Sequence, residues 1–284
     1  MVASPRLRQR QPARQRWKYA TWQKRMPASN VQSGAGALPH YNHRVPIPIE
    51  AILASKERIA SGVLDLRFTI NSPTRLAFQA GQFVTLNVPG QDAAASMRRS
   101  YSIASPTFRG EQVRLIARQI TGGHASEYFT RLSPGDQVSM AGPFGGFTLG
   151  ESHPGDLVFG TTGTGIATIM PMLEELARTP ERAPGKRIVH WGLRRAEDIF
   201  ARDEIEDLCQ RAGAELCIHL SSAGPGWEGR HGRINGSVLA LVPGLCAPVF
   251  YLVGNGAMVA EMRSSLVEQG VDRKRQIRTE AFFG

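Results

Sequence analysis

The chain has 284 residues, of which 42% are hydrophobic, and its formal net charge is +10 at pH 7. This length allows two domains of ordinary size, and the apolar content excludes a chain that is disordered throughout. No apolar run approaches the ~18 residues of a membrane-spanning helix, and no apolar segment typical of a secretory signal stands near the start. Only three cysteines occur, which favours a reducing compartment, so we expect a cytoplasmic protein.

The positive charge is concentrated at the start of the chain. Residues 1–49 contain nine Lys and Arg residues and no Asp or Glu, which leaves 25 basic residues against 24 acidic ones in the remainder. Because residues 1–40 are also rich in Gln, Ala, Ser and Pro, we expect them to form a disordered tail. Tyr19, Trp22 and Met26, with basic residues between them, leave a second interpretation open. On that interpretation the tail binds an anionic membrane or a nucleic acid, or directs the chain to an organelle.

Residues 41–149 have the pattern of an antiparallel β barrel. The segment 63–70 alternates apolar and polar residues with a period of two, which is typical of a half-buried strand. Short strands that recur between Gly and Pro turns favour a barrel or a sandwich. The other expected strands are 82–88, 113–120 and 137–140, and one helix is expected over 125–132.

Residues 150–284 change to an alternation of strands and helices. This alternation predicts a doubly wound α/β domain with a parallel sheet. Ligands of such sheets bind beyond the carboxyl ends of the strands. The expected strands are 157–159, 187–191, 216–220 and 249–253, and the expected helices are 166–178, 202–212 and 258–269.

The tetrapeptide Arg99-Ser100-Tyr101-Ser102 is the first pattern with a specific chemistry. Arg99 offers a planar guanidinium that suits a pyrophosphate. Tyr101 offers a flat ring on which a planar cofactor can stack, and Ser102 adds a hydroxyl close by. By itself the pattern also fits an ordinary strand end in a barrel, so its weight depends on what accompanies it.

A glycine-rich segment, Gly160-Thr161-Thr162-Gly163-Thr164-Gly165, stands later in the chain between a predicted strand and a predicted helix. It lacks the third glycine of the G-x-G-x-x-G dinucleotide fingerprint, because Thr168 stands at that place. The two patterns in this order resemble the ferredoxin–NADP reductase family, and the resemblance spans residues 45–284. This family joins an FAD-binding barrel to a nicotinamide-binding α/β domain. The resemblance therefore implies FAD and NADP as cofactors.

The resemblance implies an FAD site built from two segments of the barrel domain. Arg99 would grip the pyrophosphate together with the turn at 122–126, which opens the predicted helix and matches the family's G-x-x-S/T pattern. The strand around 116–118 would flank the flavin or its ribityl chain, and 142–147 matches the family's G-P-x-G-x-F pattern. The residues implied in FAD binding are Arg99, Ser100, Tyr101, Ser102, Ile116, Ala117, Arg118, Gly122, Gly123, Ala125 and Ser126.

The resemblance also implies a nicotinamide site in the α/β domain. Gly163, Thr164 and Gly165 match the family's G-G-T-G-I-A-P motif, with Thr168 in the place of its proline. Gly254 and Asn255 match the family's C-G-P-x-x-M turn, which lies against the nicotinamide.

The preference for NADPH over NADH depends on two arginines. Arg194 and Arg233 stand where NADP-using bacterial relatives bind the 2′-phosphate, whereas Ser221 and Ser222 replace a third arginine. No acidic residue stands out to select a free ribose hydroxyl, so NADPH is favoured.

The end of the chain completes the implied site. In relatives an aromatic residue near the terminus stacks on the flavin and moves when nicotinamide enters, and Phe282 is the positional match. A core-filling role for Phe282 is the alternative. Glu280 and Ser102 could tune the flavin, so the catalytic candidates are Ser102, Glu280 and Phe282. The histidines and cysteines show no metal-ligand spacing, and we expect no metal; His190 and His219 are expected to be core residues.

The implied function is hydride transfer from NADPH to flavin N5, followed by one-electron transfer to a ferredoxin or flavodoxin-like carrier. The chain lacks the C-x₄-C-x₂-C pattern of a fused ferredoxin domain, which favours a separate carrier. An NAD(P)H-dependent reductase component of a multi-protein oxygenase is the first alternative. A non-catalytic protein that binds through its basic tail is the second.

Overall fold

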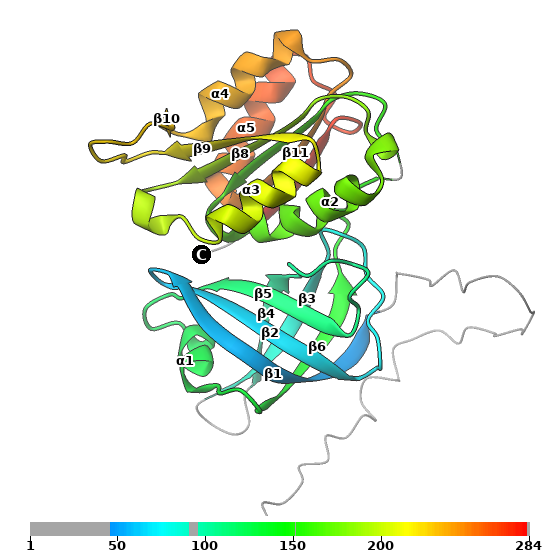
Figure 1. Ribbon diagram of the computed structural model, residues 1–284, viewed down its shortest axis with the longest axis vertical. Coiled ribbons are helices and arrows are strands. Elements are labelled where there is room, and N and C mark those ends of the chain that lie inside the picture. Colours follow the sequence, from blue (N-terminus) through cyan, green and yellow to red (C-terminus); the bar gives the residue numbers. More distant parts are fainter. Residues whose placement is uncertain (1–45, 91–95, 151, 283–284) are drawn as a thin grey trace, which may run out of the picture. The chain divides into compact units, whose positions relative to one another are not determined.

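The computed structural model of the chain describes residues 46–90, 96–150 and 152–282. Within these residues the chain forms two six-stranded sheets (Figure 1). The predictions for the basic tail at residues 1–40 lie outside the described residues. In the described ranges, no helix is long and apolar enough to cross a membrane.

The first sheet is antiparallel and has the order β4-β3-β6-β1-β2-β5. Its edge strands β4 and β5 also lie against each other, so the sheet curls into a barrel-like form. This confirms the predicted antiparallel barrel. The elements are β1 (Ile47–Ala60), β2 (Val63–Ser72), β3 (Phe83–Pro89), β4 (Ser96–Ser102), β5 (Gln112–Arg118), α1 (His124–Arg131) and β6 (Gln137–Phe144).

The core of this sheet follows from the alternation of its strands. In β2 the side chains of Leu66, Phe68 and Ile70 are buried, whereas Arg67 and Thr69 between them are exposed. The buried set joins one apolar cluster inside the barrel. Period-two patterning therefore decides which face of each strand is turned inward.

The second sheet is parallel throughout, with the order β10-β9-β8-β7-β11-β12. This confirms the predicted doubly wound α/β fold. The elements are β7 (Leu157–Thr162), a 3-10 turn (Gly163–Gly165), α2 (Ile166–Arg178), β8 (Arg187–Leu193), α3 (Arg202–Arg211), β9 (Ala214–Leu220), β10 (Arg230–His231), α4 (Ile234–Leu241), β11 (Val249–Asn255), α5 (Gly256–Glu268) and β12 (Ile277–Phe282).

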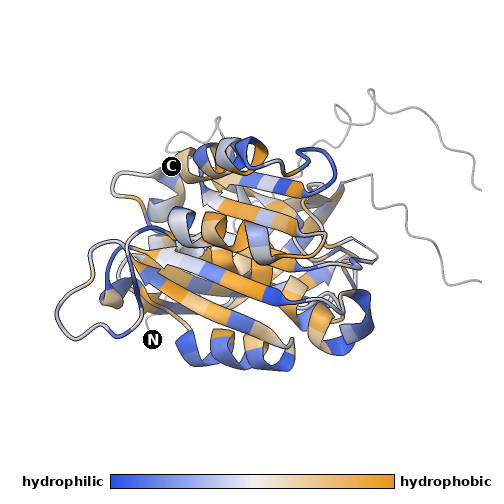
Figure 2. Cartoon of the chain, turned by 90° about the horizontal axis from the view of Figure 1, so that it is seen from above, coloured by the Kyte–Doolittle hydropathy of each residue, from blue (hydrophilic) through white to orange (hydrophobic). Residues whose placement is uncertain are grey.

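Helices cover both faces of the parallel sheet (Figure 1). Helices α2 and α3 share a core with Phe159 and Trp191, whereas α4 and α5 pack around Val158 and Leu252 on the other face. A sheet buried on both faces needs continuously apolar strands, and every residue of β8 is buried. Figure 2 shows strands with long hydrophobic stretches, and helices in which hydrophobic and hydrophilic residues alternate.

Two histidines lie within this core, as the sequence predicts. His190 on β8 and His219 on β9 are buried, and His190 Nδ1 lies 2.9 Å from His219 Nε2. Burial lowers the pKa of both imidazoles to about 4, assisted by the positive charge of Arg230 and, for His190, by His219 itself. Both rings are therefore neutral at pH 7.

Candidate active site

The face of β4 that bears Arg99 and Tyr101 is the first part of the site. Side chains two residues apart on a strand point the same way, so both residues lie on one face and Ser100 lies on the other. The Arg99 side chain is exposed, and its Nη1 donates to the carbonyl oxygen of Arg98 at 3.0 Å. Because that partner is neutral, the guanidinium keeps its charge available for a phosphate.

Tyr101 connects this strand to α1. Its ring meets the ring of Phe129, on α1, edge to face with centroids 5.4 Å apart. Burial raises the pKa of the Tyr101 phenol to about 12, although the charge of Arg99 opposes the shift. The phenol therefore stays neutral, and α1 is held beside the strand that carries Arg99.

The start of α1 has the features of an anion site. Gly123 is the residue that caps the helix, and because glycine has no side chain it makes no capping hydrogen bond to the first N–H groups of the helix. Gly122 has φ of +71°, and apart from its two chain neighbours no atom of the described residues lies within 4 Å of where a Cβ would stand. Ser126 Oγ accepts a hydrogen bond from the Ile120 N–H at 2.7 Å, which closes the turn. Exposed N–H groups at a helix start, near an arginine, fit a pyrophosphate.

Strand β5 contains three of the residues that the resemblance implies in flavin binding, and two of them are buried. Ile116 and Ala117 are both buried, one in each of two apolar clusters, so only their main chain could meet a cofactor. Arg118 alone of the three has an exposed side chain.

Ser102 brings the end of β4 to the parallel sheet. It is 8% exposed, and its Oγ accepts a hydrogen bond of 2.9 Å from Thr168 Oγ1 in the first turn of α2. That turn follows directly after Gly163–Gly165. The strand with the FAD candidates thus ends beside the loop with the nicotinamide candidates.

The loop at Gly163–Gly165 is fixed by its neighbours. Trp191 Nε1 donates a hydrogen bond of 2.9 Å to the Gly163 carbonyl oxygen, which orients the loop from β8. Thr162 Oγ1 accepts one of 2.9 Å from the Asn255 N–H, which joins the ends of β7 and β11. The contact of Trp191 was not predicted, because a tryptophan inside an apolar strand gives no sequence signal for such a role.

The turn after β11 is equally constrained. Gly254 has φ of +124°, and a Cβ there would lie 2.4 Å from Thr162 Oγ1, so only glycine fits. Asn255 Oδ1 accepts a hydrogen bond of 3.1 Å from the Met258 N–H and so caps α5. The amide nitrogen of Asn255 is the part that is left for a ligand.

Strand β12 runs beside this turn. Its register pairs Glu280 with Val253 and Phe282 with Asn255, so both residues lie at the carboxyl end of β11. Burial raises the pKa of Glu280 to about 7. Phe282 is half-buried against the apolar cluster that contains Val253, so it packs on the core at the edge of the site.

Of the two arginines proposed for the adenosine end, one follows β8 and the other follows the short strand β10. Arg194 follows β8, and its carbonyl oxygen accepts the Ser222 N–H at 2.8 Å. Arg233 caps the start of α4. Both side chains are exposed, and within the described ranges neither pairs with a carboxylate, whereas the neighbouring Arg195 pairs with Glu197 at 3.4 Å.

Buried polar atoms without partners also gather along this edge. The side-chain amide of Asn235, in the first turn of α4, is 9% exposed, and neither of its polar atoms has a partner in the described chain. The same holds for Thr161 Oγ1, at the end of β7. Since buried polar groups are nearly always satisfied, these atoms fit a polar ligand or bound water along the edge.

The carboxyl edge of the parallel sheet therefore gathers the nucleotide candidates in spatial order. Arg233 follows β10 and Arg194 follows β8, the glycine-rich loop follows β7, the Gly254–Asn255 turn stands at the end of β11, and Glu280 and Phe282 lie on β12. Doubly wound sheets bind dinucleotides at this edge. The end of the edge that carries the two arginines would bind the adenosine half, and the end near Ser102 would bind the nicotinamide half. The residues present fit both cofactors.

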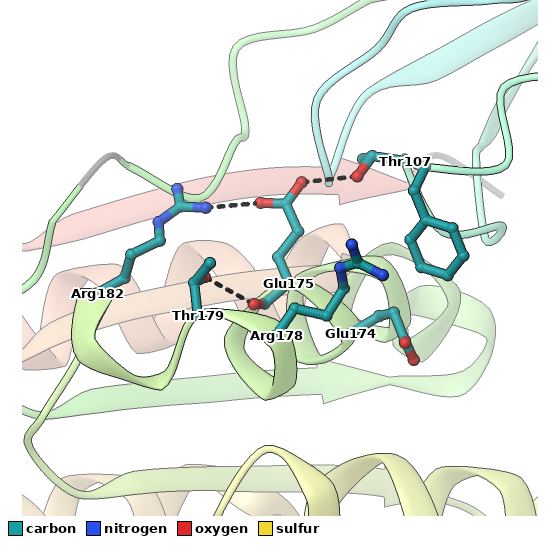
Figure 3. Close-up of a pocket in the computed structure, with 7 residues that line it drawn as sticks. Thr107, Glu174, Glu175, Arg178, Thr179 and Arg182 are labelled. Atoms are coloured by element: carbon teal, nitrogen blue, oxygen red, sulfur yellow. Dashed lines mark hydrogen bonds and ion pairs between the residues drawn. The ribbon is translucent and has the colours of Figure 1, made fainter.

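A small cavity of about 70 Å³ lies elsewhere, between the loop at Thr107 and helix α2 (Figure 3). Its Glu175 carboxylate accepts a hydrogen bond of 3.1 Å from Thr107 Oγ1 and pairs with Arg182 at 3.0 Å. Ligand pockets usually enclose ~300 Å³ or more, so this cavity is too small for a dinucleotide. It is a contact that ties a barrel loop to α2.

Two family models match the chain in the order of its sheets. Residues 50–149 match the oxidoreductase FAD-binding domain, and residues 160–264 match the oxidoreductase NAD-binding domain. Ferredoxin–NADP reductase B of Sorangium cellulosum is 34% identical over 235 residues, which cover 80% of this chain and 95% of that protein. The chain belongs to the ferredoxin–NADP reductase family. It is therefore an oxidoreductase with FAD and NAD(P) as cofactors, which confirms the prediction of an enzyme.

Other members of the family show how widely the fold is used. The reductase component DmpP of phenol 2-monooxygenase, from Pseudomonas sp. strain CF600, is 29% identical, and the match covers 79% of this chain and 65% of that protein. The structure of a ferredoxin NADP⁺ reductase from Neisseria gonorrhoeae with bound FAD and NADP shares the fold, with a TM-score of 0.69 at 21% identity. The match covers 84% of this chain and 99% of that one.

Proposed function

We propose that the protein exchanges electrons between NADP(H) and a separate one-electron carrier, a ferredoxin or a flavodoxin, by means of bound FAD. The hydrogen bond between Ser102 and Thr168 carries this proposal, because it joins the FAD strand to the nicotinamide loop at 2.9 Å. FAD would supply the chemistry, since a flavin takes up two electrons together and releases them singly. The chain's own residues would bind and orient the two cofactors and would hold protons near them.

The FAD pyrophosphate is assigned to Arg99 and the start of α1. Arg99 supplies a charge-assisted fork, and the N–H groups after Gly123 supply neutral donors. The two are kept together by the packing of Tyr101 on Phe129. We therefore propose that residues 41–149 form the FAD-binding domain and that residues 150–284 form the NADP-binding domain.

NADPH is proposed as the nucleotide because Arg194 and Arg233 present charge at the adenosine end of the edge. A 2′-phosphate gains charge-assisted hydrogen bonds from arginines, whereas a ribose hydroxyl gains little. Glu197, which follows β8 on the same loop as Arg194, pairs with Arg195 instead.

Two groups at the nicotinamide end are assigned to proton handling. Glu280 has a pKa of about 7 and so can hold or release a proton near neutral pH. Ser102, whose hydroxyl is buried and bonded to Thr168, is the candidate on the barrel side. Phe282, two residues after Glu280 on β12, is proposed as the aromatic that competes with nicotinamide.

The carrier is tested by mixing the purified protein with NADPH and either a ferredoxin or a flavodoxin under anaerobic conditions. The proposal expects NADPH-dependent reduction of at least one carrier, at a rate that depends on carrier concentration. If NADPH reduces the FAD but neither carrier accepts electrons, the carrier assignment is wrong while the oxidoreductase assignment remains.

A reductase component of a multi-protein oxygenase is the second candidate. The match to the phenol 2-monooxygenase component covers 79% of the chain, and Ser221 and Ser222 weaken the phosphate site of an NADP-specific enzyme. This candidate expects equal or better turnover with NADH than with NADPH. Comparison of the two nucleotides with the same carrier separates the candidates.

A further inference from the structure

A pair of buried hydroxyls joins the barrel to the α/β domain at the proposed site. Thr168 Oγ1 and Ser102 Oγ lie 2.9 Å apart, and within the described residues the Thr168 hydroxyl has no other hydrogen-bond partner, so we assign its hydrogen to Ser102. Thr168 has no exposed surface and Ser102 is 8% exposed, so bulk water does not compensate either group. The bond is therefore a fixed feature of the site.

Thr168 donates in a direction that is unusual for a helix. Threonine hydroxyls in helices commonly bond a carbonyl three or four residues earlier. Thr130 in α1 and Thr179 at the end of α2 both do so, each at 2.8 Å. Thr168 instead bonds across to β4, which commits its hydroxyl to Ser102.

This direction has a consequence for the Ser102 hydroxyl. A serine hydroxyl has one hydrogen to donate and two lone pairs that accept. Because Ser102 accepts from Thr168, its own hydrogen is left to donate to another group. We propose that Thr168 is the positioning residue of Ser102, fixing its oxygen so that its hydrogen is available to an acceptor on the flavin.

The same bond links Ser102 to the nicotinamide loop. Thr168 lies in the turn of α2 that follows Gly163–Gly165, so a shift of this loop moves the partner of Ser102. The motif that the loop resembles has proline at this position, which has no side-chain donor. The sequence departure at Thr168 is thus the source of the bond. This inference rests on the placement of Ser102 beside the flavin in the proposed function.

The test is a double-mutant cycle on the FAD-loaded protein with Thr168→Val, Ser102→Ala and the double variant. Two quantities are measured: the rate of anaerobic flavin reduction by NADPH, and the midpoint potential of the bound FAD during reduction by dithionite without nucleotide. We expect Thr168→Val to slow reduction by about fivefold with an unchanged apparent affinity for NADPH, the factor typical of one lost hydrogen bond. The midpoint potential of the FAD bound to Thr168→Val should shift in the same direction as that of the FAD bound to Ser102→Ala.

The decisive comparison is the effect of Thr168→Val in a chain that already carries Ser102→Ala. If Thr168 acts through Ser102, the double variant matches Ser102→Ala in rate and potential. Thr168→Ser keeps the hydroxyl and should have the wild-type rate and the wild-type potential. If the valine variant does not fold, Thr168→Ala repeats the test with a smaller side chain. Thr179→Val, which removes a hydroxyl bonded to the Glu175 carbonyl oxygen on the same helix, should change neither quantity.

The outcomes separate the inference from the proposed function. Equal effects of Thr168→Val in the wild-type and Ser102→Ala backgrounds, or no effect in either, would overturn the positioning role. A wild-type rate and potential for Ser102→Ala would overturn both the role of Ser102 and the inference. If NADPH fails to reduce wild-type FAD while the potentials still show the coupling, the proposed function fails and the inference stands.

Discussion

Arg114 on β5 and Glu204 on α3 form an ion pair across the two domains, with Nη2 2.9 Å from Oε2. The Nε of Arg114 also donates to Asp65 Oδ1, on β2, at 3.0 Å. The side chains of Arg114 and Asp65 are 10% and 5% exposed, whereas Glu204 is 43% exposed. The two residues on the barrel strands are therefore buried, whereas Glu204 on α3 is partly exposed to solvent.

Replacement of Arg114 by Met should reduce the free energy of unfolding by about 3 kcal/mol, because it leaves the buried Asp65 carboxylate with only the exposed Arg67, at 3.1 Å, as its ion-pair partner. Glu204→Gln should cost about 1 kcal/mol or less, because Glu204 is half-exposed. Denaturant unfolding measures both. Arg202→Met, which breaks the exposed Arg202–Glu206 pair, is the matched control and should resemble Glu204→Gln. Equal losses for all three variants would contradict the buried role of Arg114.

Arg99→Ala should weaken FAD binding by about 2–3 kcal/mol, because it removes a charge-assisted contact to the pyrophosphate. Titration of flavin-free protein with FAD gives the dissociation constant. Arg98→Ala removes a charge from the opposite face of the same strand and should change the dissociation constant for FAD little. If both variants bind FAD like the wild type, Arg99 does not hold the pyrophosphate.

Replacement of both Arg194 and Arg233 by Ala should raise KM for NADPH much more than KM for NADH. Each lost charge-assisted contact to the 2′-phosphate costs ~1.5–3 kcal/mol, and NADH makes neither contact. Steady-state kinetics with both nucleotides measure the effect. Arg195→Ala, next in sequence but paired with Glu197, serves as the control. A parallel rise for both nucleotides would show that neither arginine recognises the phosphate.

Phe282→Ala should tighten nicotinamide nucleotide binding and relax the preference for NADPH. An aromatic that occupies the flavin face lowers the apparent affinity in proportion to the time that the face is covered. Nucleotide dissociation constants and kcat, measured for NADPH and NADH, test this. Turnover should fall if product release becomes slower. Affinity and selectivity that both stay at wild-type values would instead assign Phe282 to the core alone.

Glu280→Gln should change the pH dependence of stability. Burial raises the folded-state pKa of Glu280 from 4.5 to about 7, so between these values the folded state binds more protons than the unfolded state. The contribution of Glu280 to stability is therefore present at low pH and is lost as pH rises through this window. Unfolding measured from about pH 5 to about pH 8 should show a larger loss in the wild type than in Glu280→Gln. Identical profiles would mean that the carboxyl is not perturbed.

The fold was largely predictable because its strands carry strong periodic patterns. The helix expected at 166–178 coincides with α2, and the helix expected at 125–132 differs from α1 by one residue at each end. Strand β1 was missed because Pro48 interrupts its pattern. The structure tolerates this proline because β1 begins to pair with β2 only at Glu50. Helix α4 was missed because Asn235 and Gly236 in its first turn have low helix propensity.

The candidate site was predictable only where a motif carries it. The glycine turns and Arg99 could be found because their residue types are tied to backbone shape and charge. The hydrogen bonds of Trp191 to Gly163 and of Thr168 to Ser102 could not be found, because each joins residues that only the folded sheets bring together. The one available signal was the replacement of the motif's proline by Thr168. The buried side chains of Ile116 and Ala117 likewise depend on packing that the sequence pattern does not specify.

The central claim is that NADPH reduces FAD bound to this chain, and anaerobic titration of the purified protein tests it most directly. The account predicts a yellow protein whose oxidised flavin absorbance is lost on addition of about one equivalent of NADPH, since one hydride reduces one flavin. It also predicts slower reduction by NADH, because NADH lacks the phosphate that Arg194 and Arg233 are proposed to bind. A colourless protein, or flavin absorbance that persists with both nucleotides, would contradict the account.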